Sequence, residues 1–233
     1  MKKQSALLLA LCLFALVLAM CLYSAPRLAQ EATAYAQATP VVVIDAGHGG
    51  EDGGASSPDG VLESGLNLQF ALRMRDLLQF AGVETMMLRE TDTALYTDGC
   101  SVIAEKKVSD LKNRVALING TPGALLVSIH QNSLPSHPST HGAQVFFNAV
   151  DPAGEVAQGV QQALNMSLDG GKTVKAMDGG VYLMKQIRCP GVLVECGFLS
   201  NDKEAAHLQT EEHQRRLATA ILAGLLQYST KEG

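Results

Sequence analysis

The spacing of apolar residues along this chain predicts alternating strands and helices. Short apolar runs bounded by turn residues are typical of strands buried in a parallel sheet. Such runs lie at residues 41–44, 83–88, 124–129, 143–147 and 192–194. Apolar residues at helical spacing predict helices over residues 66–80, 111–118, 155–168 and 217–226. This alternation predicts a single-domain α/β fold, with a largely parallel twisted sheet flanked by helices on both faces.

The other stretches of the folded part follow neither spacing. Residues 91–107 are polar and irregular, and residues 169–180 are rich in glycine, so both are predicted as loops. Asn201, followed three residues later by Glu204, resembles the capped start of one more helix.

The first 39 residues differ in composition from the rest of the chain. Lys2 and Lys3 precede an unbroken apolar run over residues 6–22, which is the layout of an export signal or a membrane anchor. Because the positive end stays inside, the rest of the chain is expected outside the membrane. We predict a signal or anchor segment and linker over residues 1–39, a folded domain over residues 40–230, and membrane contact only through the first segment.

Composition and charge narrow the class of protein. The formal net charge of −5 gives no general affinity for nucleic acid. Two of the five cysteines lie in the export segment, and the remaining three, Cys100, Cys189 and Cys196, cannot all pair within one chain. The absence of a C-x-x-C pair disfavours a cysteine zinc site. Free thiols are expected, with a Cys189–Cys196 disulfide as the alternative.

Residues that carry chemistry follow three of the predicted strands. The first strand leads to Asp45 and then to a glycine-rich turn that contains His48. His130 follows the third strand, and Glu195 follows the short strand at residues 192–194. Binding sites of open α/β sheets form at the carboxyl ends of the strands, and glycine lets the backbone approach a ligand closely. The sequence therefore predicts a site at this edge of the sheet.

The two histidines indicate a metal site. Two histidines and one carboxylate form a common ligand set for catalytic zinc and leave the fourth position to water. His48 and His130 supply the histidines, and the spacing leaves two candidates for the carboxylate, Glu51 and Glu63. A further carboxylate must stay off the metal as the general base, and Glu195 suits that role. We expect one Zn²⁺ per chain.

Four blocks of sequence occur in an order that resembles a known family. They read DAGHGGEDGGA, LESGLNL, VSIHQNS and LVECGFLSN. In this order they resemble the zinc-dependent N-acetylmuramoyl-L-alanine amidases. The resemblance implies that His48, Glu63 and His130 hold zinc and that Glu195 is catalytic, so it favours Glu63 over Glu51. It also implies hydrolysis of the amide bond between the lactyl group of muramic acid and L-alanine in peptidoglycan.

Two stretches, SIHQNSLPS and GVYLMKQIRCPGVLVECGFLSN, are most similar to the branch of the family that acts on the spore cortex of endospore formers. This resemblance implies export to the cell wall or cortex, where another enzyme converts the peptide-free muramic acid into muramic-δ-lactam. Two blocks depart from the family pattern. ESG replaces the usual EKD at residues 63–65, and HQNS replaces H-x-N-A at residues 130–133. Neither change removes a proposed ligand.

Two other functions remain as alternatives. One is a zinc carboxypeptidase that uses His48, Glu51 and His130 to act on wall peptides. The other is a non-catalytic peptidoglycan-binding protein on the same scaffold, against which the intact set of four site residues argues. Peptidoglycan is the expected partner in every case, and the sequence does not identify an activating protein.

Overall fold

The structure of this chain is a computed structural model that describes residues 13–14, 16–20, 22–23, 40–168, 171–176 and 181–229. The chain divides into two units, residues 1–39 and residues 40–233. The predicted signal or anchor segment lies mostly outside the described residues, and the described residues between 13 and 23 are helical and exposed. Among the described residues, no helix has the length and apolar character needed to cross a membrane.

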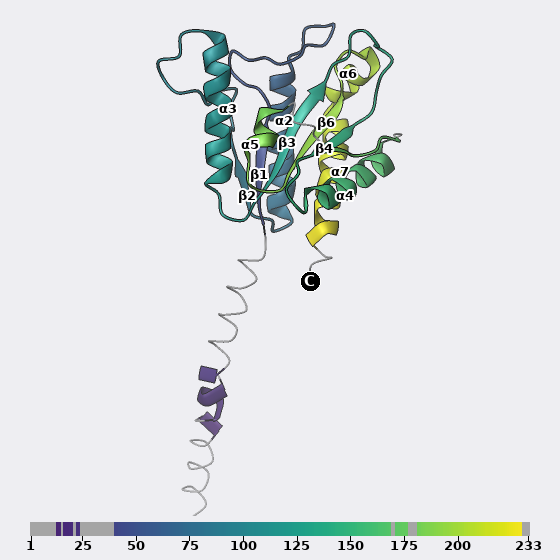
Figure 1. Ribbon diagram of the computed structural model, residues 1–233. Coiled ribbons are helices and arrows are strands. Elements are labelled where there is room, and N and C mark those ends of the chain that lie inside the picture. The colour runs from purple at the N-terminus through teal and green to yellow at the C-terminus, as the bar shows by residue number, and fades with distance from the viewer. Residues whose placement is uncertain are drawn as a thin grey trace, which may run out of the picture. The chain divides into compact units, whose positions relative to one another are not determined.

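The folded unit is built on one mixed sheet, with the strand order β2-β1-β3-β6-β4-β5 among the described residues (Figure 1). The strands are β1 (Val41–Ala46), β2 (Thr85–Met87), β3 (Ala124–Asn132), β4 (Gln144–Phe147), β5 (Lys175–Ala176) and β6 (Gly191–Phe198). Strands β2, β1, β3 and β6 run parallel, whereas β4 pairs antiparallel with β6 and parallel with β5. The carboxyl ends of β1, β3 and β6 therefore meet at one edge of the sheet.

Helices cover both faces of this sheet. They are α2 (Glu63–Phe80), α3 (Ile103–Asn119), α4 (Ala153–Ser167), α5 (Tyr182–Gln186), α6 (Asp202–Leu208) and α7 (Glu211–Ser229). Successive strand residues point to opposite faces. Val42 and Ile44 of β1 accordingly pack in the core formed with α2, α4 and α7, while Val43 packs in the core formed with α3 and α5. The predicted α/β fold with helices on both faces is confirmed.

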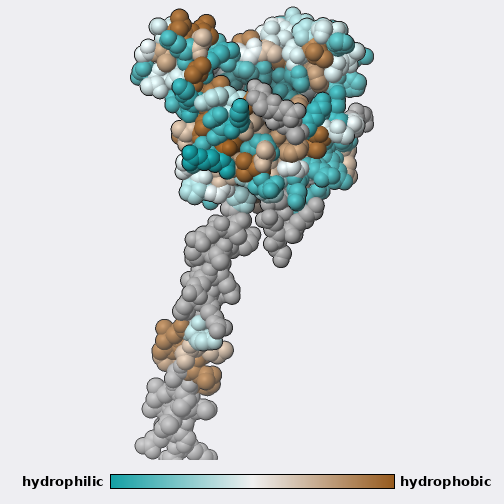
Figure 2. Space-filling view, viewed as in Figure 1, coloured by the Kyte–Doolittle hydropathy of each residue, from teal (hydrophilic) through white to brown (hydrophobic). Residues whose placement is uncertain are grey.

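Helix α3 is the element that departs most from the sequence prediction. The prediction placed a loop over residues 91–107 and a helix over 111–118, whereas α3 begins at Ile103. The first turns lack an apolar face directed at the core, because Ile103 and Val108 are more than half exposed. Figure 2 shows hydrophobic residues gathered on the surface of the lobe that α3 occupies in Figure 1.

Smaller differences follow from strand pairing. Asp45, His130 and Glu195 lie within their strands rather than after them, because pairing continues along β1, β3 and β6 and places His130 in register with Glu195. Strand β5 and helix α5 are too short to produce a hydrophobic pattern and were not predicted. The loop predicted at residues 169–180 lies partly outside the described residues. The predicted cap of α6 is confirmed, since the Asn201 side chain accepts hydrogen bonds from the Lys203 and Glu204 amides.

Helices α4 and α7 pack together through a pair of glycines. A Cβ atom added at Gly224 of α7 would lie 2.4 Å from the Cα atom of Val160 on α4. A Cβ atom at Gly159 would lie 3.0 Å from the carbonyl oxygen of Gly224. The close approach of the two helix backbones therefore requires glycine at these positions.

We expect Gly224→Ala to destabilise the fold by about 1–3 kcal/mol, because the added methyl group forces α7 away from α4. The matched control is Gly65→Ala in α2, where an added Cβ atom meets nothing within 4 Å. This control should be neutral or stabilising by up to about 1 kcal/mol through higher helix propensity. Denaturant unfolding of both variants measures the difference, and a Gly224→Ala variant as stable as the parent would contradict the packing argument.

Candidate metal centre

The loop after β1 brings His48 to the edge of the sheet in an uncommon backbone conformation. His48 has a φ of 61°, the one positive φ of a non-glycine residue in the described part of the chain. The preceding residue, Gly47, lies against the His130 ring, and a Cβ atom there would lie 2.2 Å from the His130 Cε1 atom. Only glycine at this position lets the loop and the ring of His130 approach so closely.

Three side chains from different elements converge at this edge. The Nε2 atom of His48 lies 3.3 Å from one carboxylate oxygen of Glu63, and the Nδ1 atom of His130 lies 2.9 Å from the other. The two rings are 5.1 Å apart and nearly perpendicular. One ligand atom from each residue lies within 4.8 Å of the others, so the three side chains could hold a metal ion. Two imidazoles and one carboxylate are a fitting donor set.

The Glu63 carboxylate is held in place from several sides. It accepts hydrogen bonds from the backbone amides of Ala55 and Gln131, at 2.9 and 3.1 Å, and from the side-chain amide of Asn67 at 3.2 Å. Asn67, one turn further along α2, also donates to the carbonyl oxygen of Gly47 at 3.1 Å. Asn67 therefore ties the carboxylate to the loop that carries His48. Sequence reasoning did not identify this residue.

Glu63 and His48 change each other's protonation. Burial alone would lower the pKa of His48, but the hydrogen bonds and charges of Glu63 and then of Asp52 together outweigh it and raise that pKa to about 9. Burial alone would raise the pKa of Glu63, but His130 and His48 outweigh it and hold that pKa far below its ordinary value. The carboxylate therefore stays ionised and attracts either a proton on His48 or a cation.

Two buried arginines donate hydrogen bonds to backbone carbonyl oxygens of the loop after β1. Arg114 of α3 forms a buried ion pair with Asp45 and donates to the carbonyl oxygens of Ala46 and His48, the second at 2.8 Å. Arg89 donates to the carbonyl oxygens of Ala46 and Gly47, at 2.8 and 3.1 Å. Arg114 is thus a structural ion-pair partner, and Asp45 anchors it. Arg89 was not identified from the sequence, where a lone arginine carries no signal of burial.

Glu195 lies beside this group but makes different contacts. It pairs in register with His130 on β3 and with Gln144 on β4, and one of its carboxylate oxygens is buried without a hydrogen-bond partner among the described residues. Burial raises the pKa of Glu195 to about 7; the charge of Glu63 adds to the rise and that of His130 opposes it. A carboxylate that is partly protonated near neutral pH is suited to proton transfer.

Comparison with known proteins identifies the family. The model of the N-acetylmuramoyl-L-alanine amidase family matches residues 42–227. The chain belongs to this family. The germination-specific N-acetylmuramoyl-L-alanine amidase of Bacillus subtilis (strain 168) is 39% identical over 194 residues, which cover 83% of this chain and 81% of that protein.

Solved structures of amidases share the fold. The CwlD amidase of Clostridioides difficile, solved in complex with the GerS lipoprotein, matches with a TM-score of 0.78 and 34% identity over 83% of this chain and 100% of that chain. The catalytic domain of CwlV, from Bacillus (Paenibacillus) polymyxa var. colistinus, matches with a TM-score of 0.69 and 28% identity. The match covers 82% of this chain and 99% of that chain. The expected family is confirmed, and its amidase activity on cell-wall peptidoglycan is that of this chain.

The other candidate residues of the amidase lie away from the three converging side chains. Glu51 is half exposed and accepts a hydrogen bond from Lys106 at 2.6 Å, so the structure brings Glu63, not Glu51, to the two histidines. Cys196 is buried on the opposite face of the sheet from Glu195, as alternation along β6 predicts. The three cysteines of the folded unit, Cys100, Cys189 and Cys196, are free thiols, and the alternative disulfide is not formed.

We expect metal binding by the amidase to release a proton near neutral pH. A proton on His48, whose pKa is about 9, must leave before the ring can bind an ion. Between pH 7 and 9 the affinity for Zn²⁺ should therefore rise about tenfold per pH unit and then level off. Competition with a chromophoric chelator at several pH values measures this slope. An affinity independent of pH over this interval would contradict the Glu63–His48 coupling.

Proposed function

We propose that the amidase is a zinc enzyme in which His48, Glu63 and His130 hold one Zn²⁺. The donor set supports this choice of metal. Imidazole nitrogens suit zinc, whereas Ca²⁺ and Mg²⁺ prefer shells made of oxygen atoms. The observation that carries the proposal is the convergence of the two histidine nitrogens on the two oxygens of one buried carboxylate.

The proposed reaction is hydrolysis of the amide bond between the lactyl group of N-acetylmuramic acid and L-alanine. When bound, Zn²⁺ would polarise the attacking water and the scissile carbonyl and stabilise the developing oxyanion. We assign Glu195 as the general base, which takes the proton of the water and passes it to the leaving amine. Its burial favours this role, because a carboxylate with a pKa near 7 both accepts and returns a proton.

The biological setting is proposed from the relatives. The similarity to a germination-specific amidase supports a role in the spore cortex, where the peptide-free muramic acid would be the substrate for muramic-δ-lactam formation by another enzyme. We propose export through a signal or anchor segment at residues 1–39, followed by the catalytic domain at residues 40–230. A protein partner is also proposed, because the similar CwlD amidase was solved in complex with a lipoprotein.

We expect the two glutamates near His48 to differ sharply as metal ligands. Glu63→Ala should lose most bound Zn²⁺, because one of three protein ligands is removed. Glu51→Ala should keep one Zn²⁺ per chain, because Glu51 contacts Lys106 instead. Metal analysis after gel filtration measures both. A chain that loses zinc with Glu51→Ala and keeps it with Glu63→Ala would support the carboxypeptidase alternative instead.

We expect Glu195→Gln to keep its zinc and lose turnover by about a hundredfold or more, because the substitution keeps the size and removes the basicity. The assay incubates cortex peptidoglycan with the protein and measures released stem peptides with new L-alanine N-termini by mass spectrometry. The parent chain should release them, and its failure to do so with zinc bound would favour the non-catalytic alternative. A Glu195→Gln variant with near-normal turnover would overturn the role of base, whereas loss of zinc would make Glu195 a ligand.

A further inference from the structure

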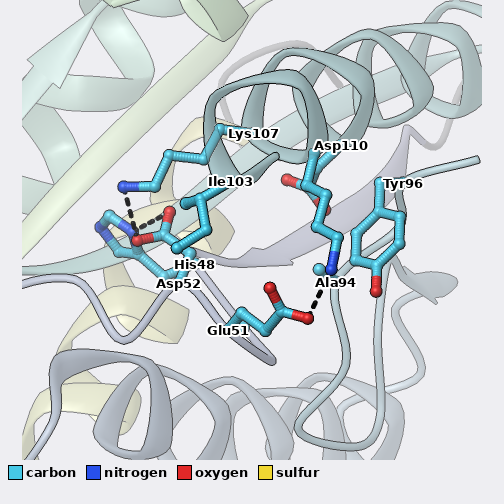
Figure 3. Close-up of a pocket in the computed structure, with 10 residues that line it drawn as sticks. His48, Glu51, Asp52, Ala94, Tyr96, Ile103, Lys107 and Asp110 are labelled. Carbon is cyan, nitrogen blue, oxygen red and sulfur yellow. Dashed lines mark hydrogen bonds and ion pairs between the residues drawn. The ribbon is translucent and has the colours of Figure 1, made fainter. Parts of the chain in front are cut away.

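The ring nitrogen of His48 that faces away from Glu63 has a partner of its own. The Nδ1 atom of His48 lies 2.9 Å from an oxygen of the Asp52 carboxylate. Residues 49 and 52 exchange two backbone hydrogen bonds, at 2.9 and 3.2 Å, which turn the chain back on itself. This tight turn returns the Asp52 side chain to the His48 ring, as Figure 3 shows.

The second oxygen of Asp52 is held from helix α3. The ammonium group of Lys107 lies 2.8 Å from this oxygen, and the backbone amide of Gly54 donates to it at 3.3 Å. The close-up shows Lys107 reaching from the helix to Asp52 beside the histidine (Figure 3). Lys107 therefore contacts Asp52, and Asp52 in turn contacts the ring of His48.

The contact with Asp52 determines which nitrogen of the His48 ring carries the proton. A neutral imidazole donates from one nitrogen and accepts at the other. A carboxylate at Nδ1 favours the tautomer with its proton on Nδ1, which leaves the lone pair of Nε2 free. The Nε2 atom is the one 3.3 Å from Glu63, where the ligand atoms converge. Carboxylates that accept from a metal-bound histidine also fix the orientation of its ring and raise its basicity.

We propose that Asp52 and Lys107 are positioning residues of the metal centre. Asp52 fixes the tautomer and direction of the His48 ring, and Lys107 fixes Asp52. The inference rests on the proposed role of His48 as a zinc ligand, and it adds two residues that lie on the Nδ1 side of the His48 ring, away from Glu63.

The same loop and helix contain a matched pair of contacts that lacks this connection. Lys106, the neighbour of Lys107, lies 2.6 Å from Glu51 and 4.9 Å from the centre of the Tyr96 ring. Both lysines attach α3 to the loop, but Glu51 has no hydrogen bond to either histidine in the described part of the chain. A purely structural attachment would make the two lysines equivalent, whereas the positioning role separates them.

The test measures Zn²⁺ affinity of the full chain by competition with a chromophoric chelator, without any substrate. Asp52→Ala should weaken zinc binding about tenfold or more, as removal of such a supporting partner does. Asp52→Asn, which keeps an acceptor oxygen and loses the charge, should lie between Asp52→Ala and the parent. Lys107→Met alone should weaken zinc binding severalfold. The double variant with Asp52→Ala and Lys107→Met should bind zinc as weakly as Asp52→Ala alone. Lys106→Met should bind zinc like the parent.

The thermal unfolding temperature of the metal-free variants separates positioning from folding, because all of them should unfold close to the parent. The inference is overturned if Asp52→Ala binds zinc within twofold of the parent. It is also overturned if Lys106→Met weakens binding as much as Lys107→Met, or if the effects of Asp52→Ala and Lys107→Met add. A parent chain that binds no zinc would overturn the proposed function as well. A parent that binds zinc beside an unaffected Asp52→Ala would overturn this inference alone.

Discussion

The buried carboxylate of Glu63 sets the condition that the rest of the site meets. An ionised carboxylate removed from water is stable only when it is paired and hydrogen-bonded. Two backbone amides, the Asn67 amide and two histidines surround it. Because these partners come from the loop after β1, from α2 and from β3, the carboxylate fixes the relative position of three elements that are distant in sequence.

Two buried positive charges, on Arg89 and Arg114, support the loop after β1 that carries His48. Arg89 and Arg114 direct their guanidinium groups at the carbonyl oxygens of residues 46–48. Buried carbonyl groups need partners, and a loop that leaves the sheet has lost those of its strand. The arginines supply them, and Asp45 and Asp110 compensate the charge of Arg114. The positive φ of His48 is therefore stabilised by Arg114 at its carbonyl oxygen and by Glu63 and Asp52 at its ring.

The sequence predicted those features that depend on local pattern. Alternating apolar runs predicted the sheet and the main helices, and four blocks of motif identified His48, Glu63, His130 and Glu195 as a set. The direction of β4 was not predictable, because an antiparallel edge strand has the same local pattern as a parallel one. Spacing alone also left Glu51 and Glu63 equal, since the choice depends on where α2 begins relative to the sheet. The supporting roles of Asn67 and Arg89 depend on contacts across twenty or more residues of the chain, which no local pattern records.

The weak apolar attachment of α3 has a consequence for how the protein responds to dissolved ions. Only Arg114 and Ile118 of this helix are buried, and both lie in its second half. The first half is joined to the loop by two partly exposed ion pairs, Lys106–Glu51 and Lys107–Asp52. Mobile ions screen such pairs over distances of about 10 Å at ordinary ionic strength. Concentrated salt therefore loosens one end of α3 while the buried core is unaffected. In a cell wall, dissolved ions would therefore act on the first half of α3 and on its lysine contacts to the loop, while the buried arginines keep the backbone of the loop that carries His48 in place.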